Sequence, residues 1–231
     1  MNIRCLDWDS AFFGLRIGRA DVSSAAELEL LATQEMLLKQ QFDLLYVFCP
    51  QTVRWQQHNA ALVDEKTIYT KRIVSQTIGT QVDIYMGNVQ DNDLYRLALV
   101  SGEYSRYRLD KRFPEGSYER LYRRWIEQAV NGNMADKVFV YRENDHIHGM
   151  LTLQWDDHQA DIGLVAVDTD VQGRGIGSLL MQNTENWLAH NTSVQTLKVA
   201  TQWTNTKARR WYEKNGFVVE CVTNIYHWWL R

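Results

Sequence analysis

A glycine-rich stretch in the second half of the chain has the residue types and spacing of an anion-binding loop. The apolar run at residues 162–167 reads as a buried strand, and residues 178–190 have helical periodicity, with Gly173, Gly175 and Gly177 between the two. Glycines let a backbone approach a ligand, and unpaired N–H groups at a helix start point at an anion with the helix dipole behind them. This order of elements predicts a phosphate-binding site.

The spacing of the glycines excludes two common phosphate-binding motifs. A P-loop ends in Gly-Lys-Ser/Thr, whereas here Ile176 stands before Gly177 and Ser178, so no lysine reaches a terminal phosphate. A dinucleotide-binding fingerprint needs the spacing G-x-G-x-x-G, whereas these glycines stand at alternate positions.

Composition describes an ordinary globular protein. The chain has 231 residues, of which 45% are hydrophobic and 23% are charged, enough to bury a core. Its formal net charge of −3 argues against a protein that binds nucleic acid through bulk positive charge. An anionic ligand therefore needs a local site.

Cysteine usage and the N-terminal sequence indicate the compartment. Cys5, Cys49 and Cys221 are widely spaced and form no C-x-x-C pair, which favours a reducing compartment over a disulfide framework or a zinc site. The first residues contain no signal-peptide core, and no run approaches the roughly 20 apolar residues of a membrane span. We expect a soluble, cytoplasmic protein with no metal and no nucleic-acid or membrane partner.

The elements before the glycine loop predict two parts of unequal size. A helix is expected over residues 24–41 and a buried strand over 42–48, followed by alternating segments at 67–74 and 80–85. The polar stretch at 87–93 is the best domain boundary. We therefore predict a small N-terminal α/β domain, residues 1–90, and a second domain, residues 91–231.

The second part places the loop within an alternation of strands and helices. Helices are expected at 94–101 and 117–130, and a meander of strands leads to the strand at 160–167. After the loop and its helix the pattern predicts a strand, a helix and two closing strands: 194–201, 205–214, 217–221 and 225–230. This predicts an α/β fold, with a mixed central sheet flanked by helices.

The segment 105–114 is among the most basic in the chain and contains Arg106, Arg108 and Arg112. One interpretation is an exposed loop. The other is a pocket for a phosphorylated acceptor, because arginine forks match phosphate oxygens bidentately. Both interpretations stay open at this point.

The stretch Gln172-Gly173-Arg174-Gly175-Ile176-Gly177 resembles the Q/R-x-x-G-x-G/A signature of the GNAT superfamily of N-acetyltransferases, and the order of elements around it is similar. The resemblance implies the GNAT fold and acetyl-CoA as co-substrate, its pyrophosphate held by the loop through Ser178. It also implies that two parallel strands, at the ends of 160–167 and 194–201, splay to admit the pantetheine arm. The thioester carbonyl would then accept a hydrogen bond from a backbone N–H of Leu164, Val165, Ala166 or Val167.

Residues 205–217 resemble the N-x-x-A-x-x-x-Y-x-x-x-G-F segment of the same family. The resemblance implies that Tyr212 is the general acid that protonates the leaving thiolate, with Asn205 and Ala208 beside the pantetheine arm. A phenol with a pKa near ~10 suits this transfer. Tyr212 can also be explained as a packing residue, and Asn205 as a helix cap. The general base stays open among Asp161, His158, Glu127 and His148.

Residues 8–14, 105–108, 125–130 and 199–206 resemble acetyltransferases that act on nucleotide-linked amino sugars, over nearly the whole chain. This resemblance implies transfer to the amino group of a dTDP-linked amino-deoxy sugar, in cell-surface polysaccharide biosynthesis. Two alternatives stay open: a GNAT enzyme acting on a protein N-terminus or small amine, and a non-catalytic acyl-CoA-binding module. The N-terminal half either packs on the sheet or mediates a homodimer.

Overall fold

The structure, a computed structural model, describes residues 1–74 and 82–231. The first part of the chain alternates strands and helices: β1 (Asn2–Cys5), α1 (Asp7–Phe13), β2 (Ile17–Asp21), α2 (Ala25–Thr33), α3 (Glu35–Gln41), β3 (Leu44–Pro50), β4 (Ala60–Arg72) and β5 (Asp83–Ile84). The helix predicted over 24–41 begins at Ala25 with Ser24 as its cap, and it is interrupted at Gln34. Of the strand predicted at 80–85, Thr80 and Gln81 lie outside the described residues.

The second part contains the elements that surround the glycine loop. They are α4 (Asn92–Ser101), α5 (Arg106–Leu109), α6 (Ser117–Val130), β6 (Lys137–Glu143), β7 (His146–Trp155), β8 (Ala160–Val167), η1 (Thr169–Val171), α7 (Ile176–Asn191), β9 (Thr196–Gln202), α8 (Thr206–Lys214) and β10 (Val218–Trp229). The basic segment at 105–114 includes one short helical turn, α5, which Ser105 caps by accepting from the N–H of Tyr107.

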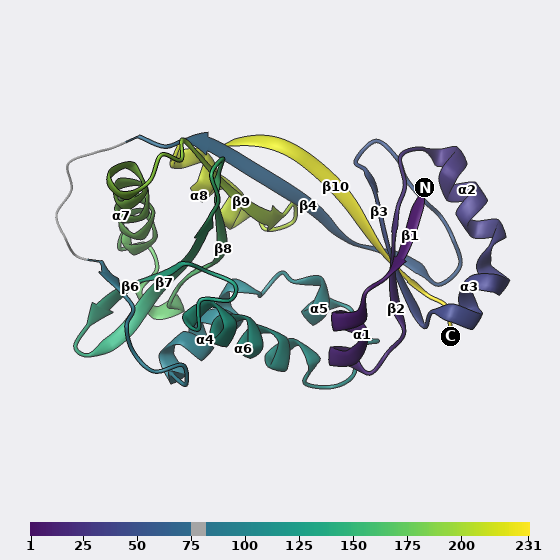
Figure 1. Ribbon diagram of the computed structural model, residues 1–231, viewed down its shortest axis with the longest axis horizontal. Helices are drawn as coiled ribbons and strands as arrows, with labels where there is room; N and C mark the ends of the chain where they lie inside the picture. The colour runs from purple at the N-terminus through teal and green to yellow at the C-terminus, as the bar shows by residue number, and fades with distance from the viewer. Residues whose placement is uncertain (75–81) are drawn as a thin grey trace.

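The described strands form one sheet in the order β1-β2-β3-β10-β4-β9-β8-β7-β6-β5. The pairs β2–β3 and β8–β9 are parallel and the others antiparallel, so the predicted mixed sheet flanked by helices is confirmed. The long strands β4 and β10 connect the two ends of the molecule, and both termini lie at the same end (Figure 1).

Strand β10 joins the two parts of the chain. It pairs with both β3 and β4, so the C-terminal strand lies between two strands of the first part. The two closing strands predicted at 217–221 and 225–230 are one strand, because irregularities at Val219/Cys221 and Ile225/Tyr226 shift its register without ending it. One sheet therefore crosses the predicted boundary near residue 90, and the division into two domains stays a prediction.

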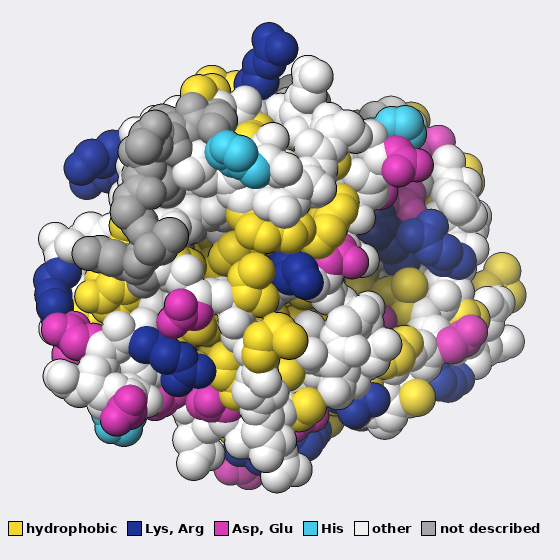
Figure 2. Space-filling view, turned by 60° about the vertical axis from the view of Figure 1, so that its left-hand side comes forward, with side chains coloured by type: hydrophobic (Ala, Val, Ile, Leu, Met, Phe, Trp, Pro, Cys, Tyr) yellow, Lys and Arg dark blue, Asp and Glu magenta, His cyan; other side chains and the backbone are white. Residues whose placement is uncertain are grey.

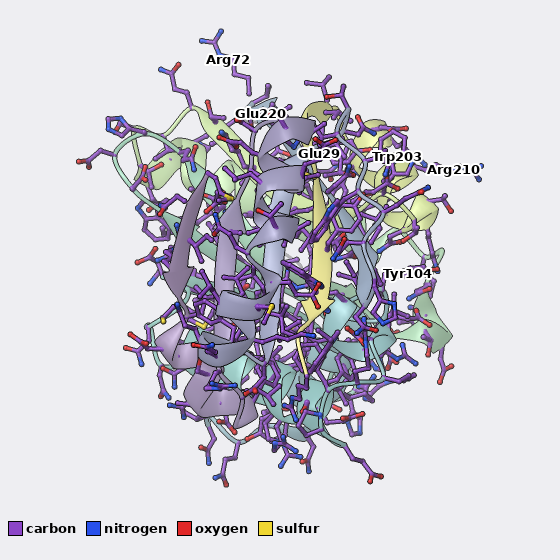
Figure 3. All side chains as sticks on the ribbon, turned by 90° about the vertical axis from the view of Figure 1, so that its right-hand side faces the viewer. Glu29, Arg72, Tyr104, Trp203, Arg210 and Glu220 are labelled. Atoms are coloured by element: carbon purple, nitrogen blue, oxygen red, sulfur yellow. The ribbon has the colours of Figure 1, made fainter. Side chains whose placement is uncertain are left out.

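Helices cover both faces of the sheet. Helices α2 and α3 pack on one face of the first strands through a cluster that includes Leu28, Leu31 and Val47, and α2 lies in front of these strands in Figure 3. The opposite face carries a second cluster with residues of α1, α4 and α6. Residues of α7 and α8 pack on β7, β8 and β9 in a third. None of the helices that the structure describes is long and apolar enough to cross a membrane.

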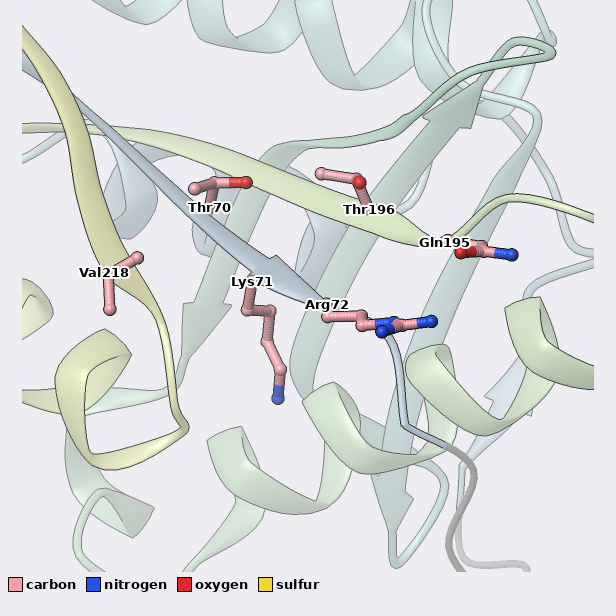
Figure 4. A pocket seen from close by; sticks show the side chains of 6 residues that line it. All are labelled: Thr70, Lys71, Arg72, Gln195, Thr196 and Val218. Atoms are coloured by element: carbon pink, nitrogen blue, oxygen red, sulfur yellow. The ribbon is translucent and has the colours of Figure 1, made fainter.

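A buried ion pair connects β4 to α7. Lys71 points from β4 toward the helices (Figure 4), and its Nζ lies 2.7 Å from Glu185 Oε1 and 2.7 Å from the carbonyl oxygen of Asn215. The two side chains are only 13% and 5% exposed. Loss of one partner of such a pair leaves an uncompensated buried charge.

We expect Glu185→Ala to lower the free energy of unfolding by about 3–5 kcal/mol, since the ammonium of Lys71 stays buried without its partner. Urea denaturation followed by circular dichroism measures this change. The control is Glu220→Ala, which removes a carboxylate 2.8 Å from Lys198 in a more exposed pair and should lower stability by about 0–1 kcal/mol. Equal losses in the two variants would contradict the role assigned to the buried pair.

Candidate active site

The glycine loop presents unpaired backbone donors at the start of α7. Gly173 and Gly175 both have φ of +84°, a conformation that side chains other than glycine rarely adopt. Gly175 is the N-cap of α7 and supplies no side-chain cap, whereas Asp91 and Asn205 cap α4 and α8 with their side chains. The first N–H groups of α7 are thus left for a ligand, and an anion is the group they favour.

Side chains hold this loop without occupying its backbone. Gln172 Nε2 donates to the carbonyl oxygen of Val167 at 2.9 Å, and Lys207 of α8 donates to Gln172 Oε1. Arg174 forms an ion pair with Glu143 of β6 at 3.0 Å. Gln172 and Arg174 therefore anchor the loop to its neighbours.

Strands β8 and β9 separate beside the loop. Their parallel pairing covers only Ala160 to Ile162 on β8, and the rest of β8 pairs with β7 alone. The N–H of Leu164 is used within the sheet, donating to Thr152 Oγ1 at 2.7 Å, and the N–H of Asp168 donates to the carbonyl oxygen of His148. Because N–H directions alternate along a strand, those of Val165 and Val167 face the open side and that of Ala166 faces β7.

Tyr212 lies on α8 with its ring in the core. It is 3% exposed and contacts the rings of Tyr69, Trp211 and Phe217. Burial, with Tyr69 beside it, raises the pKa of Tyr212 well above its usual value. Its hydroxyl has no hydrogen-bond partner among the described residues, so it is a protonated donor still free to bind.

Two contacts bring α8 next to the glycine loop. A Cβ on Gly177 would lie 3.2 Å from the Trp211 ring, so a glycine permits this close approach, and Trp211 Nε1 donates to Ser178 Oγ at 3.3 Å. Asn205 acts as the helix cap, accepting from the N–H of Ala208 at 3.1 Å. The predicted acid therefore lies one residue from a side chain that packs on the loop.

The three arginines predicted to bind an acceptor have different surroundings. Arg106 is half-buried, with its guanidinium 4.8 Å from the ring centroids of Tyr46 and Tyr107. Arg112 forms a 2.8 Å ion pair with buried Asp110, and exposed Arg108 lies 3.8 Å from Glu103. The structure places Arg106 against the sheet and gives the other two carboxylate partners; the substrate-binding role of all three stays a prediction.

The four side chains considered as general bases are also spread apart. Glu127 accepts a hydrogen bond from Tyr95 at 2.8 Å, and His148 lies 3.3 Å from Asp168. Asp161 accepts from Gln159 at the surface, and His158 belongs to an exposed turn. Nothing in these surroundings singles out one of them.

Asp64 of β4 has the surroundings of a base, and sequence reasoning missed it. Its Oδ1 is buried with no hydrogen-bond partner among the described residues. Burial raises the pKa of Asp64 to about 6, although Arg106 and Lys66 act to lower it. A carboxylate with its pKa moved toward neutrality is suited to proton abstraction. No sequence signal marks it, because its neighbour on the same side of β4, Lys66, is exposed.

A buried polar network lies beside Asp64. Asp110 Oδ2 lies 2.7 Å from His227 Nδ1 and 2.9 Å from Trp229 Nε1, and Arg112 pairs with its other oxygen. Burial lowers the pKa of His227 to about 4, so its ring is neutral at pH 7 and Nδ1 donates to Asp110. His227 Nε2 and the hydroxyl of Tyr46, whose ring stacks on His227, are buried without partners among the described residues.

Unpaired buried polar atoms are concentrated here. Such atoms of Tyr46, Asp64 and His227 on the sheet, and of Arg106 on α5 against it, lie near one another, although buried polar groups normally have partners. On the face that Figure 2 shows, positive and negative side chains are interspersed instead of gathered by sign. Around Asp64, the unpaired buried atoms offer specific hydrogen-bond donors and acceptors.

Comparison with known proteins places these features in a wider context. The model of the Acetyltransferase (GNAT) family matches residues 100–217, just over half of the chain. The dTDP-fucosamine acetyltransferase of Escherichia coli O6:H1 is 29% identical over 237 residues, covering 95% of this chain and 94% of that protein. The spore coat polysaccharide biosynthesis protein SpsD of Bacillus subtilis is 29% identical over 136 residues, covering 58% of this chain and 45% of its own length.

Two solved structures share the fold. A protein of unknown function from Staphylococcus epidermidis superposes with a TM-score of 0.62 at 16% identity, covering 93% of this chain and 84% of that one. A GCN5-related N-acetyltransferase from Sphaerobacter thermophilus gives a TM-score of 0.58 at 14% identity, covering 99% of this chain and 76% of that one.

Proposed function

The chain belongs to the GNAT family of acetyltransferases, and we propose that this N-acetyltransferase moves the acetyl group of acetyl-CoA to the amino group of a dTDP-linked amino-deoxy sugar. The observation that supports this choice of acceptor is the similarity to the dTDP-fucosamine acetyltransferase over 95% of the chain. At that coverage it includes most of residues 1–99, which the family match leaves out. These residues supply Asp64 and the buried hydroxyl of Tyr46.

The glycine loop is the proposed site for the pyrophosphate of acetyl-CoA. The uncapped start of α7 and the backbone at Gly173 and Gly175 fit an anion of this size. Bound acetyl-CoA supplies a thioester, whose pantetheine arm would pass between the separated ends of β8 and β9. The N–H groups of Val165 and Val167 face that opening and can stabilise the negative charge that develops on the thioester oxygen.

The proposed reaction is a direct transfer. Asp64 accepts a proton from the acceptor's ammonium, directly or through a water, and the free amine attacks the carbonyl carbon. A C–N bond forms, the C–S bond breaks, and Tyr212 donates its proton to the leaving thiolate. The new amide nitrogen releases its extra proton to solvent, from which Tyr212 is protonated again. The protein contributes orientation of the two substrates, an oxyanion donor and one acid–base group at each end.

Two other functions are distinguishable from this one. A GNAT enzyme acting on a protein N-terminus or small amine has no need of unpaired cations beside the acceptor's path, yet Lys66 has no ion-pair partner among the described residues. A non-catalytic acyl-CoA-binding module gives no reason for a raised pKa on Asp64. The name of SpsD supports a place in the biosynthesis of a cell-surface polysaccharide; a cytoplasmic location and a homodimer stay predictions.

Release of free thiol from acetyl-CoA, measured against a panel of nucleotide amino sugars, polyamines and peptides, tests this proposal. We expect turnover with a dTDP-linked amino sugar and little with the other amines. Turnover only with peptides or polyamines would keep the family and overturn the acceptor. Acetyl-CoA binding without turnover on any amine would instead favour the binding module.

A further inference from the structure

A groove of about 470 Å³ crosses the sheet beyond Asp64, on the same face. Its lining includes Arg19 of β2, Phe48 of β3, Lys66 of β4 and Thr223 of β10. Strand register explains the grouping, because Lys66 pairs with Thr223 and Asp21 pairs with Phe48, and paired neighbours share a face. Four strands that are distant in sequence thus contribute to one depression.

Lys66 is an unpaired cation in this groove. Its ammonium forms no ion pair or hydrogen bond with any residue that the structure describes. Although the side chain remains accessible to solvent, partial burial and the neighbouring Arg106 lower the pKa of Lys66. An ammonium that is partly desolvated and close to a second cation is destabilised unless an anion approaches.

Arg106 is a second cation near Lys66, outside the residues that line the groove, and it also retains a free donor. Its Nη2 donates to the Tyr107 hydroxyl at 2.7 Å, whereas its Nε is buried without a partner among the described residues. Its guanidinium lies 5.7 Å from the centroid of the Phe48 ring, and the guanidinium of Arg19 lies 3.7 Å from the same centroid. Arg19 pairs with Asp21 at 2.5 Å, whereas Lys66 and Arg106 form no ion pair among the described residues and have only the more distant carboxylates of Asp64 and Asp9 to offset their charge.

We propose that Lys66 and Arg106, beside Phe48, bind the diphosphate of the nucleotide-linked acceptor. The proposal rests on the proposed function for the identity of the ligand, and on the two unpaired cations for the presence of an anion site. Of the three arginines predicted from the sequence to bind the acceptor, the proposal keeps only Arg106. Arg108 and Arg112 already have carboxylate partners.

The spacing along β4 supports a diphosphate-linked sugar in particular. Asp64 and Lys66 are two residues apart on one strand and face the same side, which separates them by about 7 Å along the strand. One pyranose ring can bridge that interval, with its amino group near Asp64 and its diphosphate near Lys66. A free polyamine or a peptide N-terminus has no group for the second position.

The site is tested by comparing the affinities of the wild type and of the Lys66→Gln variant for phosphate-containing ligands. With saturating CoA present to occupy the glycine loop, calorimetry would measure binding of dTDP and of inorganic pyrophosphate. We expect Lys66→Gln to weaken both by roughly 10- to 100-fold, the effect of losing one charge-assisted hydrogen bond. Lys66→Arg keeps the charge and should bind within a few-fold of the wild type. Lys198→Gln, which removes a lysine paired with Glu220 on the same sheet, should leave binding unchanged.

Kinetics separate this inference from the proposed function. The KM of a dTDP-linked amino sugar should rise in Lys66→Gln by a similar factor, with the KM of acetyl-CoA unchanged. If nucleotide amino sugars are acetylated and their KM does not move, the diphosphate site is wrong and the function stands. If dTDP binding depends on Lys66 but no nucleotide amino sugar is acetylated, the site stands and the acceptor is wrong. Absence of dTDP and pyrophosphate binding to the wild type would overturn the site.

Discussion

Replacing Tyr212 with phenylalanine is expected to lower kcat by roughly 100-fold or more, the scale of one acid–base group, with the KM of acetyl-CoA nearly unchanged. The change removes the hydroxyl that would protonate the thiolate and keeps the ring that packs against Tyr69, Trp211 and Phe217. Because burial raises the pKa of Tyr212, the phenol is protonated throughout the working pH range, as an acid must be.

The neighbouring Tyr69 provides a matched control. It is also buried in the same aromatic cluster, but its hydroxyl is engaged, donating to Glu213 at 2.9 Å and accepting from Arg209 at 3.2 Å. Tyr69→Phe should therefore alter kcat by only a few-fold, whatever it does to stability. Thiol release under saturating substrates measures both variants. Equal kcat in Tyr212→Phe and the wild type would restrict Tyr212 to packing α8 on the sheet.

The parts of the site that depend on neighbouring residues in the chain could be predicted from the sequence. Gly173 and Gly175 stand between an apolar run and a periodic segment, so a strand, loop and helix could be expected, and the structure has them. The cap at Asn205 is also a local feature, since its side chain accepts from an N–H three residues later. The separation of β8 and β9 was an expectation from family resemblance, not from local pattern.

Features that depend on strand pairing could not be predicted in this way. Asp64 and Lys66 pair with Ile225 and Thr223 of β10 in one continuous register, which places them on the same face of the sheet as Phe48. No sequence pattern brings Lys66 beside Phe48, since these residues meet through β10, more than 150 residues further along the chain. The sequence analysis also grouped Arg106, Arg108 and Arg112. In the structure the single turn of α5 and the loop after it direct these side chains to different partners.

Asp64→Asn is expected to lower kcat/KM for the acceptor by about 10²- to 10⁴-fold at pH 8, because an amide cannot accept the proton of the ammonium. In the wild type, kcat/KM should fall as the pH drops through about 6, where Asp64 becomes protonated. Lys66→Gln should move this limb to higher pH, since Lys66 helps to keep Asp64 ionised. Glu65→Gln is the control, because that neighbour faces away and pairs with Arg54 at 2.9 Å.

Stability distinguishes a catalytic Asp64 from a structural one. Its folded pKa of about 6 lies above the ordinary value of 3.8, so between these pH values the folded chain binds the proton that the unfolded chain has lost. This group therefore makes the protein less stable as the pH rises from about 4 to 6, and the penalty persists above pH 6. Asp64→Asn removes the penalty, so we expect a higher Tm than the wild type at pH 8 and a smaller difference at pH 4. Loss of activity together with a lower Tm at pH 8 would indicate that Asp64 supports the fold instead. A gain in stability with a loss of turnover is the result expected of a carboxylate kept partly buried for proton transfer.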